Sequence, residues 1–219
     1  MFLKDGERIV FIGDSVTDTG RNRPYGEGRG DGTGKGFVRE IENLITVCYP
    51  ERIIRITNMG ISGNTSADLV ARFDTDVIAL APEYAVICIG FNDVWRQFDT
   101  PTLPNVHVLL DAYKENLRIM VAKCKEAKIY PILMSPYYLE TNSEDAMLKR
   151  MNEYRAAMKS VATEADVDFI DLQEPFDELL KYRYPAFISW DRVHPNHVGS
   201  LVIAKTFLKY AGFDFGRLA

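Results

Sequence analysis

Short apolar runs alternate along this chain with longer amphipathic stretches, and this alternation constrains the fold more than any other feature of the sequence. The apolar runs have the length and composition of β-strands and cover residues 8–12, 52–57, 83–89, 129–134 and 167–172. The stretches between them carry apolar side chains at helical spacing and cover residues 36–49, 66–80, 109–125, 144–164 and 195–210. Strands that alternate with helices in this way form a parallel sheet with helices on both faces.

The expected architecture is a three-layer α/β/α sandwich around a flavodoxin-like sheet of five parallel strands in the order 2-1-3-4-5. The sequence shows no internal repeat, no linker and no break in composition. We therefore expect residues 1–219 to form one domain, which is large enough to bury a full core. Pro195 predicts the first turn of the last helix, because proline lacks the N–H that a helix start leaves unpaired.

Charge and hydropathy narrow the class of protein. The chain has 26 Lys and Arg residues against 31 Asp and Glu residues, a formal net charge of −5. This balance argues against a nucleic-acid or anionic-membrane binder, which needs a basic face. The apolar runs are too short to span a membrane, and the first residues are charged where a signal peptide is apolar. We expect a soluble, cytoplasmic protein.

The cysteines support the same compartment. Cys48, Cys88 and Cys124 are widely spaced and form no C-x-x-C pair. This pattern is typical of buried free thiols in a reducing compartment, and it predicts neither a disulfide framework nor a zinc site.

Two segments depart from the alternation of strands and helices. Residues 19–35 contain six glycines, and residues 91–108 read as a long loop that carries Trp95 and Arg96. Both segments leave the carboxyl ends of strands, where open α/β sheets bind their ligands. We expect them to form the rim of a pocket.

Polar groups follow three of the predicted strands. Ser15, in Gly13-Asp14-Ser15-Val16-Thr17-Asp18, stands where free backbone N–H groups favour developing negative charge, although Asp14 or Ser15 would also serve as a helix cap. Gly60, in Asn58-Met59-Gly60-Ile61-Ser62-Gly63-Asn64, can turn its N–H toward a ligand or form a plain strand-to-helix turn. Asn92 can direct its amide into a cleft or bond to its own backbone.

A carboxylate and an imidazole stand together near the C-terminus. Asp191 and His194 are three residues apart in Ser189-Trp190-Asp191-Arg192-Val193-His194-Pro195. This spacing lets the carboxylate accept from Nδ1–H, so that Nε2 can take a proton from a nucleophile. The alternative is a helix cap beside a surface histidine. His197 lies inside a predicted helix with no carboxylate at a comparable offset, and His107 lies at the end of the long loop. We expect both to be structural or rim residues.

The four blocks together resemble the SGNH (GDSL-type) hydrolase superfamily over essentially the whole chain. The first block is GDSVTD, in which Val16 replaces the leucine of the name-giving motif. Gly60, Asn92 and the pair Asp191 and His194 match the second, third and last blocks. Within the superfamily, the stretches IGDSVTDTGRNRP, NMGISGNT, IGFNDVWRQFD and WDRVHPN are similar to those of intracellular acetylxylan esterases.

The resemblance implies ester hydrolysis in two steps, without a cofactor or a metal, on an acetylated carbohydrate such as an acetylated xylo-oligosaccharide. Ser15 would be the nucleophile, His194 the general base and Asp191 the residue that orients the base. The oxyanion would bind to the Ser15 and Gly60 N–H groups and to the Asn92 amide.

Other residues would support this site. Asp14 and Asp18 would hold the loop beneath Ser15. Trp95, Arg96 and Trp190 would contact sugar rings, or the tryptophans would be buried in the core or in a subunit contact.

Several other functions fit parts of the pattern. A lipase, lysophospholipase or thioesterase would use the same residues on longer acyl chains. A metal-dependent phosphoesterase would use the carboxylates and His194, although no paired histidine accompanies them. The glycine-rich segment does not have the spacing of a P-loop, and a non-catalytic binding module has little physical reason to keep all of these groups. Tyr182, Tyr184, Phe187 and Trp190 suggest an exposed apolar surface and therefore a homo-oligomer.

Overall fold

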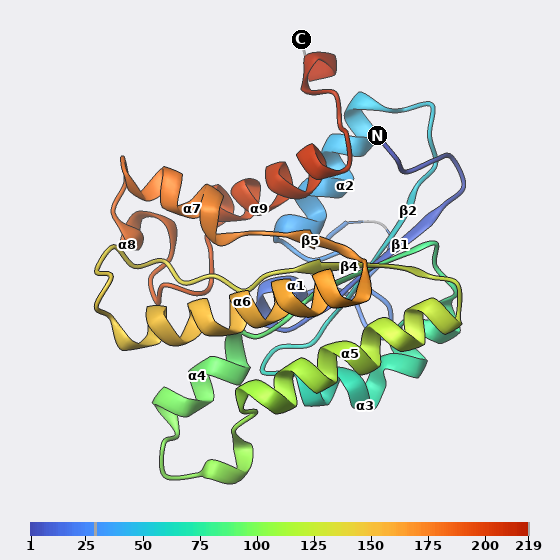
Figure 1. Cartoon of the computed structure of the whole chain (residues 1–219). Coiled ribbons are helices and arrows are strands. Elements are labelled where there is room, and N and C mark those ends of the chain that lie inside the picture. The colour runs from blue at the N-terminus through green and yellow to red at the C-terminus, as the bar shows by residue number, and fades with distance from the viewer. Residues whose placement is uncertain (29, 219) are drawn as a thin grey trace.

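Five parallel strands form the centre of the molecule in the order β2-β1-β3-β4-β5, as the sequence predicts (Figure 1). The computed structural model describes residues 1–28 and 30–218. The strands are β1 (Arg8–Gly13), β2 (Arg55–Gly60), β3 (Tyr84–Cys88), β4 (Tyr130–Met134) and β5 (Asp168–Ile170). Gly13 at the end of β1 is in register with Gly60 of β2 and Cys88 of β3. The segments that follow these strands therefore leave the same edge of the sheet at the same level.

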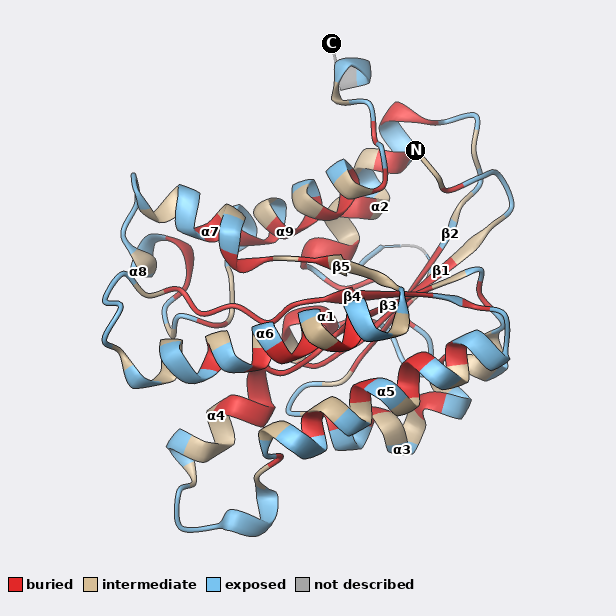
Figure 2. Ribbon diagram, in the orientation of Figure 1, coloured by how far each residue is buried: buried red, intermediate tan, exposed pale blue. Residues whose placement is uncertain are grey.

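Helices cover both faces of the sheet. In Figure 1, α2 (Phe37–Cys48), α7 (Gln173–Leu180) and α9 (His197–Tyr210) lie above the sheet. On the other side lie α3 (Ser66–Asp76), α5 (Leu110–Glu126) and α6 (Ala146–Ala165). The central strands are buried between these layers (Figure 2), and Ile9 to Ile12 of β1 have no exposed surface. Burial on both faces explains why these strands read as continuous apolar runs.

The segment 91–108 is not the long loop that the sequence analysis predicts. It begins with a helix, α4 (Phe91–Asp99), and continues with a 3₁₀ turn, η2 (Pro104–Val106). Phe91 and Val94 are buried on the side of α4 that faces the protein, and their helical spacing was the signal for this helix. The prediction failed here because the polar residues of α4 do not form one solvent-facing side: Asn92 and Asp93 are buried beside Phe91 and Val94.

Other boundaries also differ from the prediction. β2 begins at Arg55 instead of residue 52, and the helix expected over residues 66–80 ends at Asp76, followed by η1 (Ile78–Leu80). α9 begins at His197 because the side chain of Asn196, not Pro195, caps it. Three further elements were not predicted: α7, α8 (Pro185–Ile188) and η3 (Phe215–Leu218). The short helix α1 (Ser15–Asp18) corresponds to the alternative in which Asp14 caps a helix.

None of the helices in the described part of the chain is both long enough and apolar enough to cross a membrane.

Candidate active site

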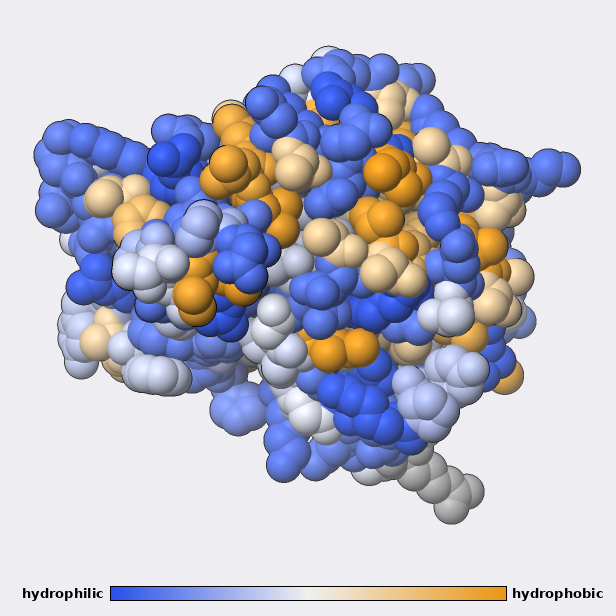
Figure 3. All heavy atoms as spheres, turned by 90° about the horizontal axis from the view of Figure 1, so that it is seen from below, coloured by the Kyte–Doolittle hydropathy of each residue, from blue (hydrophilic) through white to orange (hydrophobic). Residues whose placement is uncertain are grey.

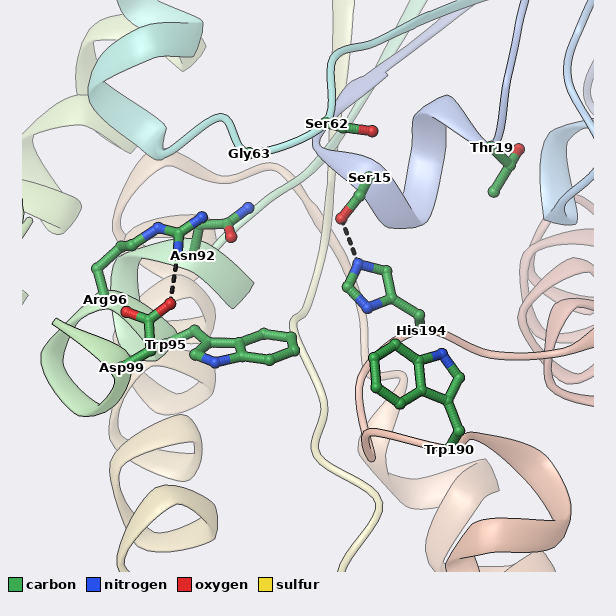
Figure 4. Close-up of a pocket in the computed structure, with 10 residues that line it drawn as sticks. All are labelled: Ser15, Thr19, Ser62, Gly63, Asn92, Trp95, Arg96, Asp99, Trp190 and His194. Atoms are coloured by element: carbon green, nitrogen blue, oxygen red, sulfur yellow. Dashed lines mark hydrogen bonds and ion pairs between the residues drawn. The ribbon is translucent and has the colours of Figure 1, made fainter.

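A cavity of about 580 Å³ opens at the carboxyl edge of the sheet, and we call it the main cavity. Its volume lies within the usual range for small-molecule sites, about 300–1,000 Å³. Figure 4 shows the residues that line it: Ser15, Thr19, Ser62, Gly63, Asn92, Trp95, Arg96, Asp99, Trp190 and His194. They come from four segments that are far apart in the sequence. The strand register explains how three of these segments reach one place.

Ser15, His194 and Asp191 form a hydrogen-bonded chain at this cavity. Ser15 Oγ lies 2.7 Å from His194 Nε2, across a sequence separation of 179 residues (Figure 4). The other ring nitrogen, Nδ1, lies 2.5 Å from Asp191 Oδ2. Because a carboxylate accepts at Nδ1–H, Nε2 is left as an acceptor for the serine hydroxyl. The arrangement can therefore move a proton from Ser15 to His194.

Asp191 is fixed by more than the imidazole. Its Oδ1 accepts hydrogen bonds from Ser189 Oγ at 2.9 Å, from Val193 N at 3.0 Å and from His194 N at 2.8 Å. Burial alone would raise the pKa of Asp191, but the hydrogen bonds from His194, Val193 and Ser189 outweigh burial and lower that pKa below its ordinary value. Asp191 therefore stays ionised beside the ring.

Two donors face the same cavity from neighbouring segments. One N–H of the Asn92 amide donates to the backbone oxygen of Asn64 at 3.0 Å, which fixes the amide and leaves its other N–H for a ligand. Gly63 has a φ of +85° and open space where a Cβ would stand. No acceptor for the Gly63 N–H is found among the described residues. This glycine keeps its backbone accessible at the cavity wall.

The prediction that Gly60 faces the ligand is wrong in this structure. The Gly60 N–H donates to Asn58 Oδ1 at 2.8 Å, and Gly60 does not line the main cavity. A Cβ on Gly60 would stand 2.3 Å from the backbone nitrogen of Asp18, so the glycine is required for close packing against α1. Gly63 holds the position at the cavity that the sequence analysis assigned to Gly60.

Asp14 and Asp93 are buried beneath the cavity, next to Ser15 and Asn92 in the sequence, and both have no exposed surface. Burial raises the pKa of Asp14 to about 8 and that of Asp93 to about 7. Asp14 Oδ1 accepts from Val16 N at 3.0 Å, so Asp14 caps the turn that carries Ser15. Asp93 accepts hydrogen bonds from the backbone and hydroxyl of Ser66, which ties α4 to the start of α3.

Arg72 of α3 joins the ends of β1 and β2. Its guanidinium donates to the backbone oxygens of Gly13 at 3.0 Å and Met59 at 2.7 Å, and to Asn64 Oδ1 at 2.7 Å. Asn64 in turn holds the Asn92 amide. One side chain thus connects the strand before Ser15, the strand before the Gly63 segment, and the support of Asn92. Sequence reasoning missed Arg72, because a single arginine in an amphipathic helix reads as a surface charge.

The residues expected to contact sugar do line the main cavity. Trp190 has 84% of its surface exposed, and the ring centroid of Trp95 lies 5.6 Å from that of His194. Figure 4 shows both tryptophans on the opposite side of Ser15 from Gly63 in this view. Arg96 is paired with Asp99 in the wall. Trp190 is therefore exposed, whereas Trp95 is partly buried and packs against the edge of the core.

The glycine-rich segment forms little of the rim. Of its described residues, only Thr19 lines the main cavity. Gly26 pairs with Asn58 in a β-bridge, and Arg21 is buried with Nε donating to the Gly60 oxygen at 2.8 Å. These contacts connect the segment to β2 rather than to the cavity.

Asp18 is fixed by charge and by hydrogen bonds. It forms an ion pair with Arg23 at 2.7 Å and accepts from Ser62 N at 3.0 Å. Burial would raise its pKa, but Arg23 and Ser62 lower the pKa below its ordinary value. Asp18 thus joins α1 to the segment that carries Gly63.

The remaining histidines lie elsewhere. His197 is exposed at the first residue of α9, and His107 lines a neighbouring cavity. Within the described residues, no three His, Cys, Asp or Glu side chains are grouped so that they could hold a metal ion.

The fold and the site together define a class of protein. The GDSL-like lipase/acylhydrolase family matches residues 11–201, and the chain belongs to this family. It is 46% identical over 217 residues to an acetylxylan esterase of Geobacillus stearothermophilus, with 99% of each protein aligned.

Solved structures show the same similarity. The chain matches the crystal structure of Axe2, an acetylxylan esterase of Geobacillus stearothermophilus, at 46% identity with a TM-score of 0.95 over 98% of each chain. Three solved catalytic mutants of Axe2 each replace one residue by alanine: a serine, an aspartate or a histidine. LAE5, an α/β hydrolase enzyme from the metagenome of Lake Arreo in Spain, is 42% identical with a TM-score of 0.94, over 97% of this chain and 98% of LAE5.

Proposed function

We propose that this protein is a serine esterase that removes acetyl groups from acetylated xylo-oligosaccharides. The observation that carries the proposal is the chain of hydrogen bonds from Ser15 through His194 to Asp191, which opens into the main cavity. The similarity to an acetylxylan esterase over the whole length supports the choice of substrate.

In the first step, Ser15 Oγ attacks the acetyl carbonyl carbon while His194 Nε2 takes the serine proton. The carbonyl π electrons move to oxygen, and the resulting oxyanion accepts hydrogen bonds from the N–H groups of Ser15 and Gly63 and from the Asn92 amide. Each such donor contributes about 10²–10³ in rate in well-studied hydrolases. His194 then protonates the departing sugar oxygen, and acetyl-Ser15 remains.

In the second step, water attacks the acetyl group and His194 again takes the proton. Collapse of the second tetrahedral species breaks the bond to Ser15 Oγ, returns the proton to the serine and releases acetate. Asp191 stays ionised and stabilises the imidazolium in both steps, in agreement with its lowered pKa.

The tryptophans at the mouth suit a carbohydrate. A pyranose presents C–H groups on its faces and hydroxyls at its edges, so flat aromatic side chains bind one and polar side chains the other. Trp95 and Trp190 provide aromatic faces at the main cavity, and Arg96 has N–H groups beyond its pair with Asp99.

Acetate release from acetylated xylo-oligosaccharides tests the proposal. We expect turnover that Ser15→Ala abolishes, while Ser143→Ala, a surface serine outside the main cavity, retains it. p-Nitrophenyl acetate should be cleaved faster than p-nitrophenyl octanoate. Faster cleavage of the octanoyl ester would replace this function by a lipase-like one, and unchanged activity of Ser15→Ala would remove Ser15 from the mechanism.

Compartment and assembly belong to the same proposal. Three buried cysteines with free thiols suit a reducing cytoplasm. The exposed aromatic side chains of Tyr182, Tyr184 and Trp190 suit a contact between copies of the chain. Size-exclusion chromatography with light scattering distinguishes an oligomer from a monomer.

A further inference from the structure

A second cavity, which we call the side cavity, adjoins the main cavity. It has a volume of about 600 Å³ and lies between α3, α5 and the segment around η2. Gly63 and Arg96 line both cavities, so the two adjoin at these residues. In Figure 4 both lie on the side of Ser15 away from Trp190. A ligand that extends from Ser15 past Gly63 would therefore enter the side cavity.

The polar groups of the side cavity suit hydroxyls. Asn116 Nδ2 donates to Ser66 Oγ at 2.9 Å, and His107 Nε2 lies 2.9 Å from the Thr100 oxygen, so both side chains are held in place. Among the described residues no partner is found for Asn116 Oδ1 or His107 Nδ1. Asn105 adds a further amide at the edge. Amide and imidazole groups both donate and accept, as sugar hydroxyls do.

Charge in the side cavity argues against an ionic ligand. Arg96 is already paired with Asp99, and Asp68 places a carboxylate in the same lining. An anion would be repelled by Asp68, and a cation would meet Arg96. A neutral polyhydroxyl ligand avoids both costs, because neither charge need be desolvated without a partner.

An apolar ligand fits less well. The lining mixes Val106 and Val108 with amides and charged groups, and an acyl chain would leave these polar groups without water or partner. Figure 3 views the molecule from the side on which α4 lies in Figure 1, and its hydrophobic residues form separate patches divided by hydrophilic ones. The surface on this side is therefore mixed in hydropathy rather than uniformly apolar.

We infer that the side cavity binds the xylose units that neighbour the acetylated one, so that the substrate chain runs from Ser15 past Gly63 and Arg96 toward His107 and Asn116. This inference rests on the proposed function and adds the direction in which the oligosaccharide lies. A smaller cavity of about 390 Å³ on the other side shares only Trp190 with the main cavity. The smaller cavity is therefore less well connected to the main cavity than the side cavity is, because only one exposed side chain joins it.

The test compares a long substrate with a short one. Ala67 and Ala112 are exposed and line the side cavity, so the double variant Ala67→Leu/Ala112→Leu fills it without entering the core. The measured quantity is the ratio of kcat/KM for acetylated xylotetraose to that for p-nitrophenyl acetate. We expect this ratio to fall about tenfold in the double variant. Thr141→Leu, which fills the smaller cavity, is the matched control and should keep the wild-type ratio.

Two outcomes would overturn the inference: a wild-type ratio in the double variant, or a fall in the Thr141→Leu ratio alone. Wild-type protein that cleaves p-nitrophenyl acetate but releases no acetate from any acetylated saccharide would instead refute the proposed function. A second measurement uses only the wild-type protein and so tests the inference even if the double variant does not fold. Unacetylated xylotetraose, added to the wild-type protein, should shift the NMR resonances of His107 and Asn116. Shifts confined to residues 141 and 184–186 would contradict the inference.

Discussion

The two halves of the site are held in place in different ways. The half that carries Ser15 and Asn92 extends directly from buried strands, and its supports come from distant parts of the chain, such as Arg72. The half that carries His194 lies on a segment outside the sheet. Among the residues that the structure describes, the donors to Asp191 lie within residues 189–194.

Contacts with the segment that follows β4 hold the second half against the protein. Tyr137 Oη donates to the Val193 oxygen at 2.8 Å, and Leu139 N donates to the Arg192 oxygen at 2.9 Å. The position of the nucleophile Ser15 therefore depends on the sheet and its distant supports, whereas the orientation of the base His194 depends mainly on a local turn. Substitutions in the His194 half should therefore lower activity with little change in stability. Substitutions among the supports of the Ser15 half should lower both.

The largest expected effect is on the local half. Asp191→Asn should lower kcat for p-nitrophenyl acetate by about 10⁴-fold, because the amide favours the wrong tautomer of His194 and cannot stabilise the imidazolium. Its melting temperature should change little, since Asn Oδ1 can still accept from the backbone of the turn. Asp177→Asn on α7 is the control and should keep full activity. A large fall in the melting temperature of Asp191→Asn would show instead that the structure of this half does not depend on the local turn alone.

On the buried half, Asn92→Ala should lower kcat by about 10²–10³-fold with a smaller change in KM, because the amide would act on the oxyanion and not on the bound ester. Gln97→Ala on the same helix is the control; it removes a side chain that bonds the Asp93 oxygen and Tyr154 away from the main cavity. A rise in KM at constant kcat would mean that Asn92 binds substrate rather than stabilising the transition state.

The same contrast explains what the sequence could reveal. The strands and the Asp191 and His194 pair follow from short local patterns, namely apolar runs and a three-residue spacing. The strand order follows from the doubly wound class of fold that those strands define. The choice between Gly60 and Gly63 does not, because it depends on which peptide faces the cavity, and here Gly60 is packed against Asp18. Arg72 was also out of reach, since its partners are backbone oxygens on two strands.

A third prediction concerns this long-range support. Arg72→Ala should lower the free energy of unfolding by about 3 kcal/mol, since it leaves Asp76 without its cation and removes a donor from the Gly13 and Met59 oxygens. It should also reduce kcat about tenfold, because Asn64 and hence Asn92 lose their anchor. Urea unfolding and kinetics on the same samples measure both. Arg150→Ala, an exposed pair with Glu153 on α6, should change stability by less than about 1 kcal/mol.

If Arg72→Ala were destabilised but kept wild-type kcat, Arg72 would support the sheet without positioning the site. Added guanidinium that restores kcat in this variant would show the opposite, since it returns the donor without the covalent link. The two results thus distinguish a purely structural role of Arg72 from a role in positioning the site.

The last expected effect is a pH dependence of stability that arises from titrating groups in the buried half. The pKa of Asp93 is raised to about 7 in the folded protein, above the ordinary value of 3.8. The folded state therefore holds a proton that the unfolded state has lost, and stability falls as the pH rises from about 4 through about 7. Asp14, with a pKa of about 8, extends the fall to higher pH.

Asp93→Asn removes one of these titrating groups and should make the free energy of unfolding fall less between pH 5 and pH 8 than in the wild type. Urea unfolding at several pH values measures the slope. Asp111→Asn, an exposed carboxylate at the start of α5, should leave the slope unchanged. An identical slope in Asp93→Asn would mean that Asp93 is ionised beside Ser66 across this range, and the buried half would then carry a charge that its surroundings compensate.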